Sequence, residues 1–190
     1  PVAAIGDAAE GVSCEICHKT GDVILDPHTL LPYPDMPGIL SMRLYRPFDG
    51  QEQVFFGTLV DVAEPGDTYL PLLSESQFCA PCHFGVFGGI TGDRMVTGGV
   101  EIYNSYGEWL ASPYSDPETG ETCQDCHMPV SEANWFVREE HGGLTRDHVA
   151  LSNHTMLGVT DVEFMQEAVS METSAQRVRD QIMVQVDIIN

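Results

Sequence analysis

One short motif occurs three times in this chain and uses all six of its cysteines. The motif is Cys-x-x-Cys-His. Two thiols at this spacing can bond to the two vinyl groups of one porphyrin, and the histidine that follows can reach the iron. Each copy therefore predicts one covalently attached haem c, three in all. The residues concerned are Cys14, Cys17 and His18, Cys79, Cys82 and His83, and Cys123, Cys126 and His127.

Other roles of paired cysteines account for less of this pattern. A thioredoxin-like Cys-x-x-Cys pair occurs once, within a βαβ unit, and needs no histidine after it. Zinc sites built from such pairs have no fixed histidine after each pair, and disulfides would leave the histidines unexplained. Haem attachment explains both the six cysteines and the residue that follows each pair.

Three haems in 190 residues change how such a chain builds its core. Each macrocycle is a large apolar plate, so porphyrin replaces much of the side-chain core of an ordinary domain. We therefore predict a mostly irregular, loop-rich fold in which a few short α-helices pack around three haems. The proline-rich segment 26–38 agrees with this, because prolines exclude a long helix there.

Capping-box patterns predict where three of the short helices begin. Ser74, Ser105 and Thr160 are each followed three residues later by Gln or Glu. The first pattern predicts a short helix that carries the second motif. The second predicts a helix through Trp109, and the third a helix at about residues 161–168.

The end of the chain has a different pattern, which predicts a small β-hairpin. Residues 168–178 and 181–189 flank a tight turn, and apolar side chains alternate along the second segment. A lone two-stranded hairpin is marginal in water, so its apolar face must be buried elsewhere. We predict a trihaem domain at 1–160. The helix and hairpin at 161–190 form a possible subunit-contact element and the remnant of a β domain.

Four further histidines are candidates for the second axial position of each iron: His28, His141, His148 and His154. Three of them would complete bis-histidine ligation, and we predict His28, His148 and His154, with His141 as the spare. Methionine is the alternative ligand, and the chain has eight. Bis-histidine iron has no open position for a substrate, which favours electron transfer over catalysis.

The chain is strongly acidic, with 29 Asp and Glu against 8 Lys and Arg and a net charge of −21. This balance argues against nucleic acid and against anionic membrane surfaces as partners. No apolar run approaches the length of a membrane span. The carboxylates of Asp116, Glu118 and Glu121 are either part of a plain turn or Ca²⁺ ligands.

Three segments resemble one known family. They are "SESQFCAPCHFGVF" (74–87), "IYNSYGEWLASPYSDPETGETCQDCHMP" (102–129) and "RDHVALSNHTMLG" (146–158). All three resemble multihaem c-type cytochromes, and the resemblance covers roughly residues 11–165. In that family a histidine ahead of a glycine supplies a distal haem ligand, which implies this role for His154 and, less directly, for His148. Family members with four or more haems are commoner, and there "VQVDIIN" opens a β-sandwich.

Some members of this family are extracellular cytochromes that polymerise into electron-conducting filaments. The resemblance therefore implies electron transfer through three bis-histidine haems, as the subunit of a head-to-tail homopolymer. The alternative is a soluble periplasmic or extracellular shuttle between redox donor and acceptor proteins. A haem oxidoreductase fits less well, because the three motifs are regular and distal histidines outnumber haems by one.

The first prediction concerns the number of haems. The intact native protein should exceed the mass of its chain by three haems, because each motif holds its haem by covalent thioether bonds. The excess mass should persist after extraction with acidified acetone, which removes haem that is not covalently bound. Haem that moves into the organic layer would contradict the assignment.

Overall fold

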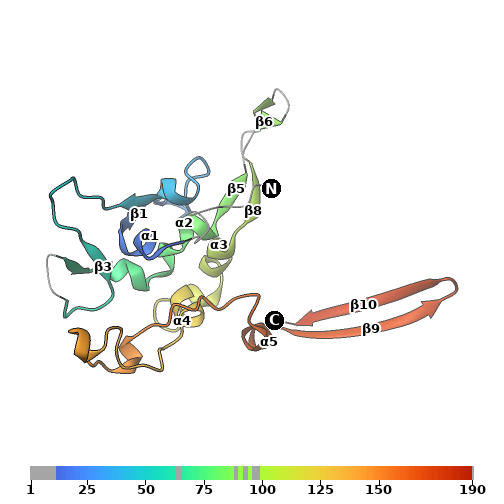
Figure 1. The fold of residues 1–190 in the computed structure, drawn as a ribbon. Helices are drawn as coiled ribbons and strands as arrows, with labels where there is room; N and C mark the ends of the chain where they lie inside the picture. Colours follow the sequence, from blue (N-terminus) through green and yellow to red (C-terminus); the bar gives the residue numbers. More distant parts are fainter. Residues whose placement is uncertain (1–11, 63–65, 88–89, 92–93, 96–98, 190) are drawn as a thin grey trace. The chain divides into compact units, whose positions relative to one another are not determined.

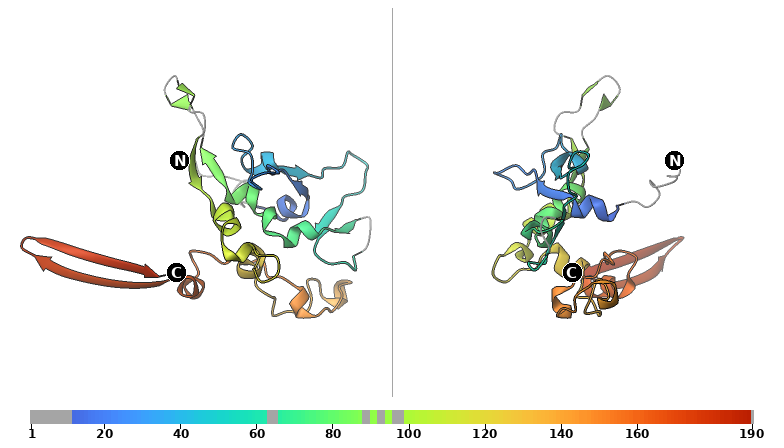
Figure 2. Two further views of the ribbon diagram at one scale, coloured as in Figure 1. Left: turned by 180° about the vertical axis from the view of Figure 1, so that it is seen from behind. Right: turned by 60° about the vertical axis from the view of Figure 1, so that its left-hand side comes forward.

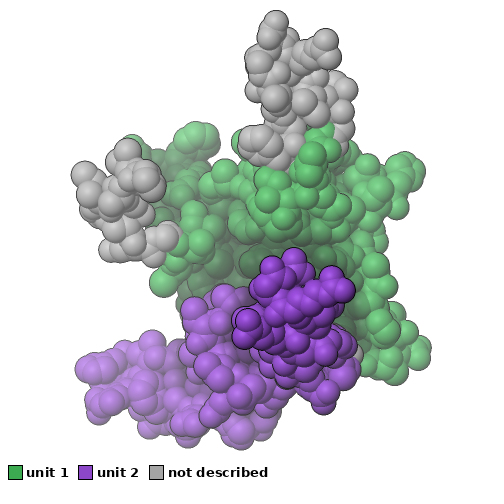
Figure 3. Space-filling view, turned by 90° about the vertical axis from the view of Figure 1, so that its right-hand side faces the viewer, with its two compact units in different colours: residues 1–124 green, residues 125–190 purple. Residues whose placement is uncertain are grey.

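The computed structural model describes residues 12–62, 66–87, 90–91, 94–95 and 99–189 (Figure 1). The chain divides into two compact units, residues 1–124 and 125–190 (Figure 3). The boundary falls inside the third Cys-x-x-Cys-His motif. The predicted domains, 1–160 and 161–190, are defined by which residues would hold haem, whereas these units are defined by contacts within the chain. The predicted division therefore stays a prediction. Within the described ranges, no helix is long and apolar enough to cross a membrane.

The first unit contains short helices separated by loops. Its α-helices are α1 (Cys14–His18), α2 (Ala80–His83) and α3 (Ser105–Leu110). Its 3-10 turns are η2 (Gly38–Ser41), η3 (Pro71–Ser74), η4 (Ser76–Phe78) and η5 (Pro113–Ser115). A further helix, α4 (Cys123–His127), spans the boundary between the units.

The strands of the first unit form separate pairs rather than one sheet. Three pairs are antiparallel: β1 (Thr20–Val23) with β2 (Met42–Leu44), β5 (Gly85–Phe87) with β8 (Val100–Tyr103), and β6 (Ile90–Thr91) with β7 (Arg94–Met95). The pair of β3 (Phe55–Gly57) and β4 (Asp67–Tyr69) is parallel. Paired strands this short add local order but cannot form a sheet with an apolar face of its own.

The second unit ends in a long hairpin. It contains the turns η6 (Glu139–His141) and η7 (His148–Ala150), the helix α5 (Val162–Ala168), and the strands β9 (Ser170–Val178) and β10 (Gln181–Ile189). The two strands pair from end to end around a tight turn in which Arg179 has φ of 59°. Figure 2 shows them as a ribbon with no third strand beside it in the described chain, and every residue of both strands is exposed. Both strands lie where the alternating sequence pattern predicts a hairpin.

The side-chain core is very small. Among the described residues, the buried hydrophobic side chains are Ala80, Phe84, Tyr106 and Leu151. Many large apolar side chains are exposed to solvent instead. For example, Phe48 is 83% exposed and Val159 is 86% exposed. A chain of this length normally buries most of the surface that its unfolded form exposes. Packing of side chains on one another therefore does not explain how this chain is stabilised.

Two helices begin one residue away from the predicted caps. Asn104, rather than Ser105, caps α3, because its Oδ1 accepts a hydrogen bond from the N–H of Gly107 at 3.0 Å. A Cβ at position 107 would clash with that amide group, so the cap also depends on the glycine. Asp161, rather than Thr160, caps α5 by accepting from the N–H of Phe164 at 2.8 Å. Asn and Asp are N-caps as strong as Ser or Thr, and each accepts from the N–H three residues further along the chain.

Candidate haem-binding site

Each of the three motifs lies on one short turn of helix. The first and third motifs are the whole of α1 and α4. In the second, Cys79 caps α2, and its carbonyl accepts hydrogen bonds from the N–H groups of Cys82 and His83 at 3.2 and 3.0 Å. In an α-helix, residues three and four apart share a face. Each motif therefore presents two thiols and one imidazole on the same side of its backbone.

The structure brings cysteines of different motifs together. All six cysteines lie in the described ranges, and none of them forms a disulfide. The thiols of Cys79 and Cys123 share a hydrogen bond, which, with burial and the charges of Cys123, Cys17 and Cys82, raises the pKa of Cys79. The pKa of Cys17 is raised by burial and then by the charges of Cys82 and Cys14. These cysteines, drawn from all three motifs, converge in the first unit.

Two motif histidines have their rings held by main-chain carbonyls. The Nδ1 atom of His18 lies 2.6 Å from the carbonyl oxygen of Phe56, and Nδ1 of His127 lies 2.5 Å from that of Leu157. A carbonyl only accepts, so Nδ1 carries the proton and Nε2 keeps its lone pair. This is the tautomer that an iron ligand needs, and such a bond also fixes the plane of the ring.

The third motif is tied to the segment just before the second. The N–H of Cys123 donates to Oγ of Ser76 at 2.9 Å, and Ser76 is 2% exposed. The side-chain amide of Gln124 donates to the carbonyls of Leu73 and Glu75 at 3.0 and 2.9 Å. These three bonds place the start of α4 beside η3 and η4. They account for the proximity of Cys123 and Cys79.

An aromatic pair covers the same region. Tyr106 is 3% exposed, and burial, followed by the charges of Cys123 and Cys79, raises its pKa. Its ring stacks on that of Trp109 with centroids 5.8 Å apart. The indole N–H of Trp109 donates to the carbonyl of Glu121 at 2.8 Å, two residues before Cys123. Helix α3 therefore places the buried Tyr106 ring close to Cys79 and Cys123.

The candidate distal histidines lie mainly on exposed loops. His28 stands in a turn in which its own N–H donates to Oδ1 of Asp26 at 2.8 Å. His148 opens η7, and the ring of His154 meets the ring of Phe136 edge-on at 6.3 Å. His141, the predicted spare, has a 72% exposed side chain with Nε2 3.7 Å from a carboxylate oxygen of Glu140. Their assignment to individual irons stays a prediction.

The donor set fits covalently bound haem. The thiols come in pairs on single helical turns, two of the following histidines are held in the ligand tautomer, and very few apolar side chains are buried. Within the described ranges, no group of three or more His, Cys, Asp or Glu is arranged around a single metal ion. Asp116 Oδ1 accepts from the N–H groups of Glu118 and Thr119 and from the Thr119 hydroxyl, and these hydrogen bonds lower the pKa of Asp116. They are the bonds of a plain turn, one of the two alternatives for these carboxylates.

The second prediction tests the tie between the motifs. Ser76→Ala leaves the half-buried N–H of Cys123 without its acceptor, so the free energy of unfolding should fall by about 1–3 kcal/mol in denaturant titrations. Ser74→Ala is the matched control, since Ser74 is exposed and makes no capping bond. The control should change stability by less than about 0.5 kcal/mol. Equal losses in the two variants would show that the Ser76 hydroxyl is not needed.

Comparison with known proteins shows one structural likeness. No family model matches the chain, and no curated protein matches it. Its fold is similar to that of a penta-heme cytochrome c552 from Thermochromatium tepidum, with a TM-score of 0.53 and 18% sequence identity. The match covers 95% of this chain and 43% of that one, so the chain spans less than half of the length of that protein. The chain thus shares its fold with part of a multihaem c-type cytochrome.

Proposed function

We propose that this chain transfers electrons through three covalently bound c-type haems, each coordinated by two histidines. The observation that carries the proposal is the convergence of Cys17, Cys79, Cys82 and Cys123 within the first unit. Haem groups anchored at neighbouring cysteines would lie close enough to exchange electrons. Bound haem supplies reversible one-electron redox chemistry, and the protein supplies attachment, orientation and burial.

The residues divide this work between them. The cysteine pairs attach the porphyrins, while His18, His83 and His127 offer one axial ligand each. The carbonyls of Phe56 and Leu157 hold two of those rings in the ligand tautomer. Tyr106 and Trp109 exclude water from one side of the converging cysteines.

The alternative functions differ in what happens at the sixth position of the iron. A haem oxidoreductase needs at least one open position for its substrate, whereas histidine at every position leaves none. Seven histidines supply the six ligands that three haems need and leave one over. We therefore favour an electron carrier over an enzyme. Periplasmic or extracellular redox proteins, or extracellular acceptors, are its proposed partners.

The third prediction concerns the sixth ligand. His154→Ala should convert one of the three haems to high-spin iron that binds carbon monoxide once reduced, because its distal ligand is gone. His141→Ala is the control, and the exposed His141 ring should be replaceable without any change in the spectrum. Visible absorption with and without carbon monoxide measures both variants. An unchanged spectrum in His154→Ala would remove His154 from the ligand set.

The hairpin supports a finer proposal, that the chain is the subunit of an extracellular filament. Strand pairing places Ile182, Val184, Val186 and Ile188 opposite Arg177, Ala175, Thr173 and Met171, so these eight side chains share one face. That face carries no carboxylate, although the chain has 29. It is a surface on which two copies of a chain of net charge −21 can meet with little repulsion.

A head-to-tail contact through this face would propagate. The hairpin of one copy would bury its apolar face against a different surface of the next, and such heterologous contacts do not close on themselves. His28 lies on an exposed turn, and in this proposal it would supply a ligand to a haem of a neighbouring copy. Cations would be needed to screen the remaining negative charge. The rival is a monomeric shuttle in which the hairpin is covered within one molecule.

The fourth prediction uses the two faces of one strand. Val184→Lys should reduce the fraction of native protein that sediments as filaments, because it places a charge in the middle of the apolar face. Gln185→Lys introduces the same charge on the opposite face and should leave sedimentation nearly unchanged. Removing 169–190, or His28→Ala, should also reduce filament formation. Native protein that remains monomeric at high concentration and high salt, with all its haems bis-histidine within one chain, would leave only the shuttle.

A further inference from the structure

The lysine that follows the first motif occupies an unusual environment. Lys19 is the only lysine of the chain and is 2% exposed. Its ammonium has neutral partners, donating to Oε1 of Gln53 at 2.7 Å and to the carbonyl of Val54 at 2.9 Å. The same group lies 3.9 Å from the centroid of the Phe55 ring. Burial of a lysine is costly unless its hydrogen bonds are satisfied, so these contacts define one built position for the side chain.

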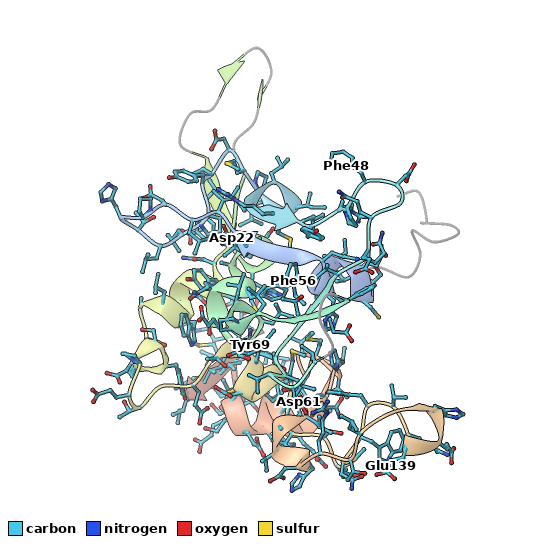
Figure 4. All side chains as sticks on the ribbon, turned by 90° about the vertical axis from the view of Figure 1, so that its left-hand side faces the viewer. Asp22, Phe48, Phe56, Asp61, Tyr69 and Glu139 are labelled. Atoms are coloured by element: carbon cyan, nitrogen blue, oxygen red, sulfur yellow. The ribbon has the colours of Figure 1, made fainter. Side chains whose placement is uncertain are left out.

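The partners of Lys19 are consecutive, and they lead directly to His18. Gln53, Val54 and Phe55 contact the ammonium, and the next residue, Phe56, accepts from Nδ1 of His18 at 2.6 Å. His18 and Lys19, at the end of α1, thus contact the four consecutive residues 53–56, which include the start of β3. Figure 4 shows the labelled Phe56 beside the pale blue ribbon of the N-terminal part of the chain. Helix α1 and strand β3 are in contact.

The segment at Tyr45 also contacts Lys19 and Phe56. The N–H of Tyr45 donates to the carbonyl of Lys19 at 2.6 Å, and the ring of Tyr45 meets the ring of Phe56 edge-on at 6.0 Å. The ring of Phe56 also lies against the backbone at Gly21, where an added Cβ would be 3.3 Å away. The position of Phe56 is therefore fixed by contacts of its ring with Tyr45 and Gly21 and, through residues 53–55, by Lys19.

We propose that Lys19 is a positioning residue for the haem of the first motif, holding residues 53–56 so that the Phe56 carbonyl fixes the His18 ring. The inference rests on the proposed function, since it requires a haem at that motif. A carbonyl that accepts from Nδ1 makes an imidazole a more basic ligand and stabilises oxidised iron. Loosening the contacts of Lys19 with residues 53–55 should therefore raise the reduction potential of that haem. Loss of a nearby positive charge alone would lower it, because a positive charge stabilises the extra electron.

Loosening these contacts and losing a positive charge shift the reduction potential in opposite directions, so the two effects can be distinguished in the haem-loaded protein. Gln53→Ala removes one acceptor of Lys19 and changes no charge, and it should raise the potential of one haem while the other two keep theirs. Lys19→Met removes both these contacts and the charge. Arg46→Gln is the control for charge, because the side chain of Arg46 is 60% exposed and pairs with Glu15 of α1 at 3.7 Å. Spectroelectrochemical titration gives the potentials.

A second measurement reports how well the contacts of Lys19 protect its amine. Because Lys19 is the only lysine, acylation of its side chain can be followed by the mass of the peptide that contains it, apart from acylation of the terminal amine. Gln53→Ala should accelerate this acylation about tenfold while Arg46→Gln leaves it unchanged. The proposal is overturned if Gln53→Ala leaves every potential unchanged, or if it lowers one. A native protein whose mass shows no haem on Cys14 and Cys17 would instead refute the proposed function at this motif.

Discussion

Covalent attachment to haem is the constraint on which this fold would depend in the proposed protein. Among the described residues, four hydrophobic side chains are buried, which is far too little to offset the conformational entropy of a chain of this length. Cysteines on single helical turns can tie the chain to rigid apolar plates at three points. Large apolar side chains are exposed, such as Phe48 and Val159, and porphyrin surface would offer such side chains a partner of matching polarity. The chain would then order itself around its cofactors rather than around its own side chains.

The local features of this fold could be predicted from sequence, and the long-range ones could not. The hairpin at β9 and β10 follows from strict alternation, and the helical turns at the motifs follow from the spacing that the chemistry needs. Two helix starts were missed by one residue, because Asn104 and Asp161 compete as caps with the serine and threonine beside them. The third predicted cap, Ser74, makes no capping bond and lies at the end of η3. No sequence pattern links Cys79 to Cys123, or Ser76 to the N–H of Cys123, since these contacts depend on the path of irregular loops.

The strong negative charge and the proposed assembly are compatible because charge is unevenly distributed. Carboxylates are spread along the loops, whereas the apolar face of the hairpin carries Arg177 as its one charged side chain. Repulsion between copies would act over the Debye length and fall steeply with salt, while the apolar contact would act only at short range. Assembly should therefore respond to ionic strength. A chain of this charge would stay dispersed in dilute buffer and associate where cations are abundant.

The two imidazoles held by carbonyls show why loops matter so much in a protein of this kind. The acceptor for His18 comes from Phe56, 38 residues along the chain, and the acceptor for His127 comes from Leu157, 30 residues along. Neither acceptor is a side chain, so substitution of Phe56 or Leu157 alone would not remove it. The orientation of each ring depends instead on whatever fixes the main chain at those two points. At Phe56 those anchors are Lys19, Tyr45 and the backbone at Gly21, and in the proposed protein these residues would set the basicity of His18 as an iron ligand without touching the iron.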